Sequence, residues 1–74
     1  MDDRMKELVA VGASVAVNCQ GCLKYHREKA LEAGANPLDI AEAVETGQMV
    51  GRGAAKITRK YAAELLASKT IKAA

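Results

Sequence analysis

The sequence predicts an all-α protein with one domain, residues 1–74, that assembles into a homo-oligomer. Helix-favouring residues dominate, and no stretch alternates apolar and polar side chains with the period of two that is typical of a strand. A chain of 74 residues buries only about 60% of the surface of its unfolded form. Phe and Trp are absent and much of the apolar content is Ala, so a single chain would have a thin core. Association with other copies is therefore expected.

We expect four helical segments, and the first runs from Asp2 or Asp3 to Asn18. It begins with acidic residues, which the positive end of a helix dipole favours. Apolar residues cover most of its circumference and leave a narrow polar stripe. Such a helix is buried on nearly all sides, and other subunits are expected to supply part of the cover. The stripe consists of Asp3, Glu7, Ser14 and Asn18.

The second and third segments are delimited by helix-capping residues. The second runs from Cys19 to Ala33, with Asn18 as its N-cap and Gly34 in the left-handed position that often follows a helix. In the third, Asn36 is the predicted cap and Pro37 suits the first helical position. This third helix is expected to end near residue 47.

The fourth helix is predicted from Gly53 to Ala67, after the glycine-rich stretch "GQMVGRG". That stretch has two interpretations, a loop or a close crossing of two helices where small residues let the backbones approach. The buried side of the fourth helix is expected to consist of Ile57, Tyr61, Leu65 and Leu66. The tail, residues 68–74, is expected to fray.

Charge and hydropathy argue against two classes of function, nucleic-acid binding and insertion into a membrane. The net charge is +2, from 11 basic and 9 acidic residues that are mixed along the chain, and no aromatic residues alternate with Lys or Arg. We therefore expect no nucleic-acid partner. The apolar run from Leu8 to Val17 is too short to cross a bilayer, and the N-terminus does not resemble a secretory signal. The prediction is a cytoplasmic protein without a membrane partner, in which a close Cys pair is catalytic or metal-binding.

The chemistry-bearing residues cluster in "NCQGCLKYH", residues 18–26. Cys19, Cys22 and His26 are separated by three, four and seven positions, so a helix would place them on one face. Leu23 shares that apolar face, and both thiols and the imidazole are expected to point into it. Tyr25 is expected to point away from it, toward a subunit contact.

This arrangement favours a reactive thiol. The N-terminus of a helix stabilises a thiolate through free N–H groups and the helix dipole. His26 lies one turn after Cys22 and can accept its proton, as in other Cys–His nucleophiles. The spacing of Cys19 and Cys22 also permits a disulfide, so the pair can cycle between dithiol and disulfide.

Glu7 is the predicted partner of the imidazole. It lies 11 residues before the turn at Asn18, and His26 lies eight residues after it. If the second helix folds back along the first, the axial offset between the two is about one turn at ~1.5 Å per residue. A carboxylate there would orient the imidazole and hold its tautomer, as the third member of a catalytic triad does.

Together these residues form the pattern E-x11-C-x-x-C-x3-H, which resembles the signature of the AhpD-like alkylhydroperoxidases in the carboxymuconolactone decarboxylase superfamily. The stretches "ELVAVGASVAVNC", "CLKYHREKALEAGA" and "NPLDIAEAV" are similar as well, and the resemblance covers residues 5–66. It implies an AhpD-like helical fold, assembly into trimers or hexamers, and thiol-dependent reduction of hydroperoxides as an antioxidant activity. The reductant would be an external dithiol or disulfide reductase, and no cofactor or metal is implied.

Position by position, the resemblance implies that Cys22 is the peroxidatic cysteine and Cys19 its disulfide partner. His26 would be the base that activates the thiol, and Glu7 the far end of the proton relay. Some alkylhydroperoxidases have a histidine between the cysteines, where this chain has Gln20 and Gly21. The chain is also about half as long as the two-repeat members, so the resemblance specifies neither the substrate nor the electron donor.

Two other interpretations remain open. Cys19, Cys22 and His26 could ligate zinc, with Glu7 or water as a fourth ligand, in a small metal-binding or redox-sensing module. Structural zinc sites usually take a second pair of ligands from another segment, and this chain has no further Cys or His. A decarboxylase of the same superfamily is less favoured, because those enzymes generally lack the cysteine pair.

Overall fold

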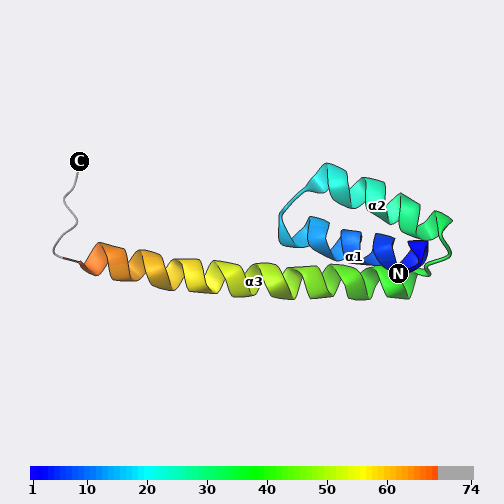
Figure 1. The fold of residues 1–74 in the computed structure, drawn as a ribbon. Coiled ribbons are helices and arrows are strands. Elements are labelled where there is room, and N and C mark those ends of the chain that lie inside the picture. Colours follow the sequence, from blue (N-terminus) through cyan, green and yellow to red (C-terminus); the bar gives the residue numbers. More distant parts are fainter. Residues whose placement is uncertain (69–74) are drawn as a thin grey trace.

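The protein consists of three helices in a computed structural model that describes residues 1–68 (Figure 1). Helix α1 spans Asp3–Ala16, α2 spans Gln20–Glu32 and α3 spans Pro37–Ala67. The described residues contain no strand, so the all-α prediction is confirmed. The prediction of four helices is wrong, because α3 is continuous through the glycine-rich stretch. No helix within residues 1–68 combines the length and the apolar character that crossing a membrane requires.

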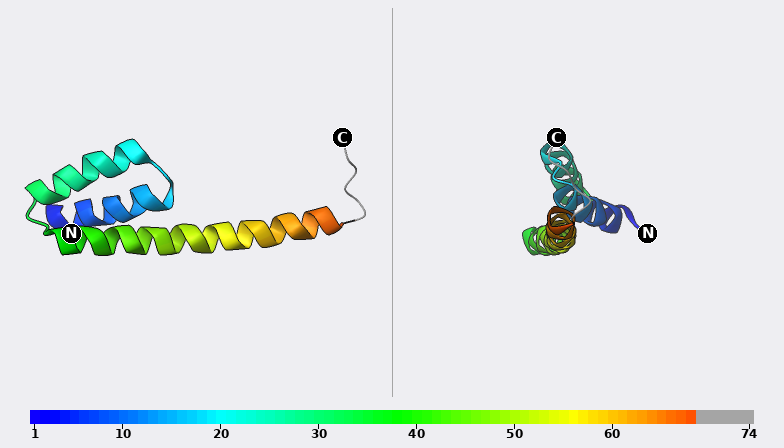
Figure 2. Two further views of the ribbon diagram at one scale, coloured as in Figure 1. Left: turned by 180° about the vertical axis from the view of Figure 1, so that it is seen from behind. Right: turned by 90° about the vertical axis from the view of Figure 1, so that its left-hand side faces the viewer.

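Helices α1 and α2 form an antiparallel hairpin that lies against the first half of α3, as both views of Figure 2 show. The second half of α3 projects beyond this body and makes the molecule 55 Å long and only 20 Å wide. We call residues 52–67 the arm, and every residue of the arm is exposed in the single chain. The chain therefore has a packed end, which carries the cysteines, and an end that contacts no other helix.

The core is as thin as the composition predicts. Its fully or nearly buried hydrophobic residues are Val11, Ala30, Ala35 and Ile40. Leu8, Leu23, Ala43 and Val44 pack against this cluster while remaining partly accessible. Among residues 1–68, Val11 has the only side chain larger than alanine that is completely buried.

Helix α3 continues where a break was predicted because its glycines serve the packing between helices. A Cβ atom on Gly47 would overlap the carbonyl oxygen of Gly12 and lie 2.9 Å from Val15 Cβ. Gly47 is buried at this contact. The close-crossing interpretation of the glycine-rich stretch is thus correct at Gly47, and the loop interpretation is wrong. Contact with α1 outweighs the cost of about 1 kcal/mol that a glycine imposes within a helix.

Two predictions of burial are wrong for the single chain. The arm residues Ile57, Tyr61 and Leu66 are 71%, 59% and 82% exposed, because α1 and α2 lie beside the first half of α3 and do not reach the arm. Leu65, which was expected on the same buried side, is 43% exposed. Helix α1 is not buried on nearly all sides either, since α2 and α3 leave Met5, Val9 and Val17 accessible.

The helix ends agree with the capping signals except at Asn18. Gly34 has a φ of 96° and ends α2 as predicted. Asn18 also adopts a left-handed conformation, with φ 58°, so it ends α1 rather than capping α2. The Cys19 N–H donates to the Ser14 carbonyl at 2.9 Å and the Asn18 N–H to the Val15 carbonyl at 3.1 Å. These two bonds form a Schellman motif, in which asparagine is tolerated at the left-handed position. Cys19 consequently becomes the N-cap of α2.

The start of α3 is closed by a capping box. The side chain of Asn36 accepts a hydrogen bond from the Asp39 N–H at 2.8 Å, and the Asp39 carboxylate accepts one from the Asn36 N–H at 3.3 Å. Pro37 occupies the first turn as predicted. At its other end α3 stops at Ala67, as predicted, while residues 69–74 of the tail that was expected to fray lie outside the described residues.

Candidate active site

Cys19 and Cys22 form a disulfide at the N-terminus of α2, with an S–S distance of 2.04 Å. The backbone of Cys19 is extended, and its Sγ accepts a hydrogen bond from the Cys22 N–H at 3.2 Å. This sulfur therefore occupies the position in which an N-cap side chain usually satisfies a free N–H. Negative charge on Cys19 would be stabilised there by the same N–H and by the helix dipole.

His26 and Glu7 are in direct contact across the α1–α2 hairpin. Nδ1 of the imidazole lies 2.7 Å from Oε2 of the carboxylate, and the two side chains are 30% and 25% exposed. The antiparallel course of the two helices brings the residues together, as expected from their distances to the turn. An ionised carboxylate accepts the proton of Nδ1, which leaves Nε2 of a neutral imidazole unprotonated. The imidazole is thus held in the tautomer that can take a proton at Nε2.

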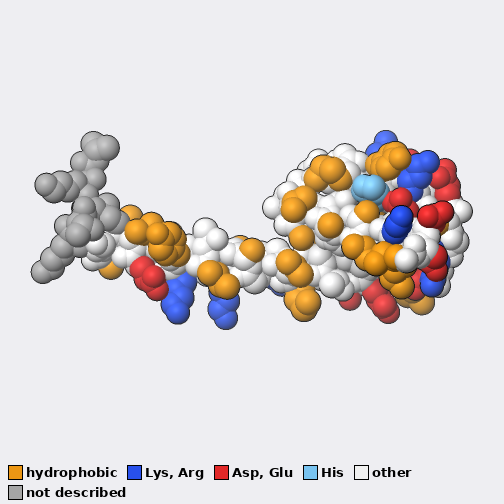
Figure 3. Space-filling view, viewed as in Figure 1, with side chains coloured by type: hydrophobic (Ala, Val, Ile, Leu, Met, Phe, Trp, Pro, Cys, Tyr) orange, Lys and Arg blue, Asp and Glu red, His pale blue; other side chains and the backbone are white. Residues whose placement is uncertain are grey.

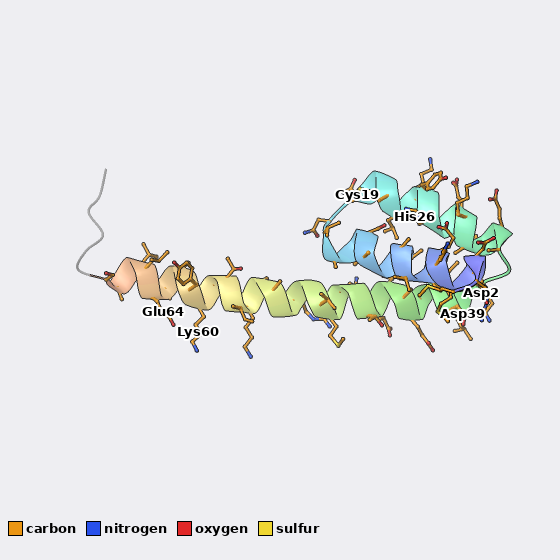
Figure 4. The ribbon with its side chains drawn as sticks, in the orientation of Figure 1. Asp2, Cys19, His26, Asp39, Lys60 and Glu64 are labelled. Atoms are coloured by element: carbon orange, nitrogen blue, oxygen red, sulfur yellow. A yellow bond between two sulfur atoms is a disulfide. The ribbon has the colours of Figure 1, made fainter. Side chains whose placement is uncertain are left out.

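The two sulfurs differ in exposure. Cys22 is exposed, whereas Cys19 and His26 are partly buried. Figure 4 labels Cys19 at the start of α2 and His26 further along the same helix. The prediction that both thiols point into the apolar side is therefore wrong for Cys22. The helical register does not extend to Cys19, because its backbone is not helical, and only Cys22 and His26 share a helix face at a spacing of four.

Within residues 1–68 no hydrogen bond joins the imidazole to either sulfur. The disulfide explains this, because it commits the Cys22 side chain to Cys19. Reduction frees that side chain to adopt another rotamer, and positions four apart on a helix are close enough for contact. Hydrogen bonds between catalytic groups are often completed only in the reacting state.

A small cavity of about 230 Å³ lies beside Cys19, where the three helices meet. Its walls include Ser14, Val15, Cys19, Leu23, Val44 and Gln48. Cys19, at the N-terminus of α2, lines this cavity, whereas Cys22 does not. The hydroxyl of Ser14 donates to the Ala10 carbonyl at 2.6 Å, so this polar atom is already satisfied. The pocket is therefore a largely apolar space next to the disulfide.

Tyr25 and Lys29 belong to the surroundings of His26, although sequence reasoning missed this role for them. The Tyr25 and His26 rings meet edge to face, with centroids 5.0 Å apart, so Tyr25 does not turn away from the site. Lys29 Nζ lies 5.6 Å from the centre of the Tyr25 ring and 3.3 Å from Glu32 Oε2. The hydrogen bond with Glu32 raises the pKa of Lys29, and the charges of Glu32, Tyr25 and Glu7 act in the same direction. Lys29 lies four residues after Tyr25 and three before Glu32, and these helical spacings could have identified the group from the sequence.

The zinc interpretation requires the cysteines as thiolates. In the disulfide state neither sulfur is a thiolate, and residues 1–68 contain no group of three or more Cys, His, Asp or Glu side chains arranged to hold a metal ion. Metal ligation by this pair would therefore require the reduced protein.

Comparisons with known proteins give one match. The sequence profile of the Carboxymuconolactone decarboxylase family matches residues 1–66. No curated protein and no solved structure matches the chain. The matched range contains α1, α2, all of α3 except its last residue, and the four residues of the candidate site.

Proposed function

The chain belongs to the carboxymuconolactone decarboxylase family, and from that premise we propose that it is a thiol-dependent peroxidase of the AhpD-like type. One observation carries this proposal: the 2.7 Å contact between His26 and Glu7 lies one helical turn after a cysteine that is paired in a disulfide. A structural histidine would not need a carboxylate partner in register with a redox pair. The assignment of roles to Cys19, Cys22, His26 and Glu7 is part of the proposal.

The first step oxidises Cys22. In the reduced protein, Nε2 of His26 removes the Cys22 thiol proton, and the thiolate attacks the terminal oxygen of a hydroperoxide. The O–O bond breaks, Cys22 becomes a sulfenic acid, and the other oxygen leaves as an alkoxide. The imidazolium returns the proton to this oxygen, so the product is the alcohol. Glu7 stabilises the imidazolium between the two transfers, as the acid of a catalytic triad does.

The second step closes the disulfide. The Cys19 thiolate attacks the sulfenic sulfur of Cys22, and the hydroxide that leaves combines with a proton to form water. Two electrons have then passed from the two thiols to the peroxide. The oxidised product of this step is the state that the structure shows, with Cys19 and Cys22 joined.

An external dithiol restores the enzyme by attack on the exposed sulfur of Cys22. Exposure matters, because thiol–disulfide exchange requires access of the incoming thiolate to one sulfur along the S–S axis. Cys19 leaves as a thiolate, and the Cys22 N–H at 3.2 Å stabilises its charge. The second thiol of the reductant then attacks the mixed disulfide and releases reduced protein and an oxidised reductant. The cytoplasm, which we propose as the location, maintains such dithiols.

The cavity beside Cys19 supports one class of substrate. Its volume is about 230 Å³ and its walls are largely apolar, so it could hold the organic group of a small hydroperoxide, whereas hydrogen peroxide has no apolar part to bury. Because Cys22 does not line the cavity, the O–O bond would have to lie at its mouth, within reach of that sulfur. We therefore expect cumene hydroperoxide to be reduced faster than hydrogen peroxide.

Replacing Glu7 with glutamine should lower the rate constant for peroxide reduction about a hundredfold, the lower end of the contribution of a positioned general base. The amide has no charge to stabilise the imidazolium. ¹⁵N NMR of His26 should at the same time show a smaller population of the tautomer with a proton on Nδ1. Asp3→Asn is the matched control, since Asp3 belongs to the same helix but no hydrogen bond or ion pair joins it to His26. Equal rates for Glu7→Gln and the wild type would exclude Glu7 from the relay.

The experiment that tests the proposed function is a single turnover in the stopped-flow instrument. Reduced, metal-free protein is mixed with one equivalent of cumene hydroperoxide, and thiols are titrated before and after. The proposal predicts consumption of one peroxide, loss of two thiols and formation of one alcohol per chain. Peroxide consumption no faster than that of free cysteine at the same pH would refute the proposal.

A further inference from the structure

The arm carries an apolar stripe that nothing in the described chain covers. The stripe begins in the first half of α3, where it packs against α1, and repeats every three or four residues along the whole helix. On the arm its members are Ala54, Ile57, Tyr61 and Leu65, all exposed; before the arm it consists of Ala43, Gly47 and Val50, of which Gly47 is buried against α1. Figure 3 shows the charged side chains of the arm along its lower edge, with hydrophobic ones above and between them, and Figure 4 places Lys60 and Glu64 on that lower edge. The arm is therefore amphipathic, like a helix that packs in a groove.

A groove of matching size lies on the body. It has a volume of about 690 Å³ and runs between α1 and the first half of α3. Met5, Val9 and Ala13 line it from α1, and Ala43, Thr46 and Val50 line it from α3. At ~1.5 Å per residue the 14 residues of α1 are about 21 Å long and the 16 residues of the arm about 24 Å. Helix α1, which forms one wall of the groove, is thus about two residues shorter than the arm, so the groove can take most of the arm.

The two halves of α3 carry opposite charge. Residues 37–51 contain three acidic residues, Asp39, Glu42 and Glu45, and no basic residue. Residues 52–67 contain four basic residues and one acidic residue, which makes a net charge of +3 against −3 in the first half. The basic residues are Arg52, Lys56, Arg59 and Lys60. Antiparallel pairing of two α3 helices would place each acidic half beside a basic half, whereas parallel pairing in register would bring like charges together.

We propose that two copies of this chain pair through antiparallel α3 helices, with the arm of each copy seated in the groove of the other. The arrangement is reciprocal about a two-fold axis, so it closes with two copies. Glu42 and Lys60 fix the register. They are 18 residues apart, about five turns, and so lie on the same side of α3. In an antiparallel pair, Glu42 of one copy then lies beside Lys60 of the other. The two-fold axis passes near Gly51, which is halfway between the two positions.

Small residues at the centre support this register. Gly51 is the midpoint and Gly53 lies two residues beyond it, and a Cβ on Gly53 would meet no atom of its own chain within 4 Å. Small side chains let two helix backbones approach closely at a crossing. The groove and the arm contain none of the four candidate catalytic residues. An experiment can therefore refute the proposed pairing without refuting the proposed peroxidase activity, and the reverse.

The test measures mass by sedimentation equilibrium over a concentration series. The wild type should contain an even number of copies. Ile57→Asp, on the stripe, should weaken the pairing at least about a hundredfold, because a carboxylate would be buried in the groove. Ala63→Asp, on the opposite face of the arm, should change it less than about threefold. Circular dichroism verifies that both variants remain helical.

A charge exchange tests the antiparallel register separately. Glu42→Lys and Lys60→Glu should each weaken the pairing about tenfold, and the double variant should recover affinity to within about threefold of the wild type. Recovery is expected only when position 42 of one copy faces position 60 of the other. A monomeric or odd-numbered wild type, an Ile57→Asp variant that pairs normally, or a double variant weaker than both single ones would overturn the proposal.

Discussion

Replacing Cys22 with serine should lower the rate of hydroperoxide reduction by at least about 10³-fold, because a hydroxyl in place of the thiolate removes the nucleophile itself. The change is nearly isosteric and occurs at an exposed position, so the helix content should stay the same. Stopped-flow measurement with cumene hydroperoxide, at equal protein concentration, gives the comparison.

Cys19→Ser is the matched control for this variant. It keeps Cys22, His26 and Glu7 and loses only the partner that closes the disulfide. The first turnover should therefore proceed within about tenfold of the wild-type rate, while repeated turnover with a dithiol should slow. If Cys22→Ser were active and Cys19→Ser inactive in the first turnover, the roles of the two sulfurs would be reversed.

Gly47→Ala should destabilise the protein by about 2 kcal/mol or more, although alanine is the better helix former. The added Cβ would overlap the Gly12 carbonyl oxygen and lie 2.9 Å from Val15 Cβ, so α1 and α3 would have to separate. A 74-residue domain has a free energy of unfolding of only about 4–11 kcal/mol. Urea denaturation followed by circular dichroism, with both proteins oxidised, measures the loss.

Gly51→Ala is the control for this prediction, one turn further along the same helix. A Cβ there would lie 3.8 Å from the Ala16 carbonyl oxygen, an ordinary contact. Both variants are measured at a protein concentration at which copies do not pair, because Gly51 is also the midpoint of the proposed pairing. Under that condition Gly51→Ala should be as stable as the wild type or gain up to about 1 kcal/mol from helix propensity. Equal stabilities of the Gly47 and Gly51 variants would contradict the close approach of α1 and α3.

The helical class and most helix ends could be predicted from the sequence because they depend on local signals. The structure places three such signals as expected: Asn36 caps α3, Pro37 lies in its first turn, and Gly34 follows α2 with a positive φ. Each depends only on the residue and its immediate neighbours in the sequence. The continuity of α3 could not be predicted in this way. A glycine indicates either a flexible loop or a close approach, and only the position of α1 decides between the two at Gly47.

The candidate site was predictable to a similar extent. A spacing of four places Cys22 and His26 on one helix face, and the distances from the turn predict the contact of His26 with Glu7, which the structure contains. The exposure of Cys22 was not predictable, because it depends on how the first turn of α2 packs against the other helices and not on spacing within α2. The N-cap of α2 was not predictable either, because Asn18 could have been that cap but adopts a left-handed conformation, and Cys19 is the N-cap instead.

The arm illustrates a different limit. Its apolar stripe predicted a buried face, but Ile57 and Tyr61 are exposed in the single chain. Periodicity identifies an apolar face and does not identify which chain, if any, covers it. The opposite charges of the two halves of α3 supply that missing information in our proposal.

The most direct test of the account is to locate the oxidised sulfur after a single encounter with peroxide. Cys19→Ser protein is treated with one equivalent of cumene hydroperoxide in the presence of dimedone, which forms a stable adduct with sulfenic acids, and is then mapped by mass spectrometry. We predict one adduct per chain, at Cys22, with a yield that falls when Glu7 is replaced by glutamine. Consumption of the peroxide without an adduct at Cys22, or no consumption at all, would contradict the central claim that this thiol is activated by His26 and Glu7.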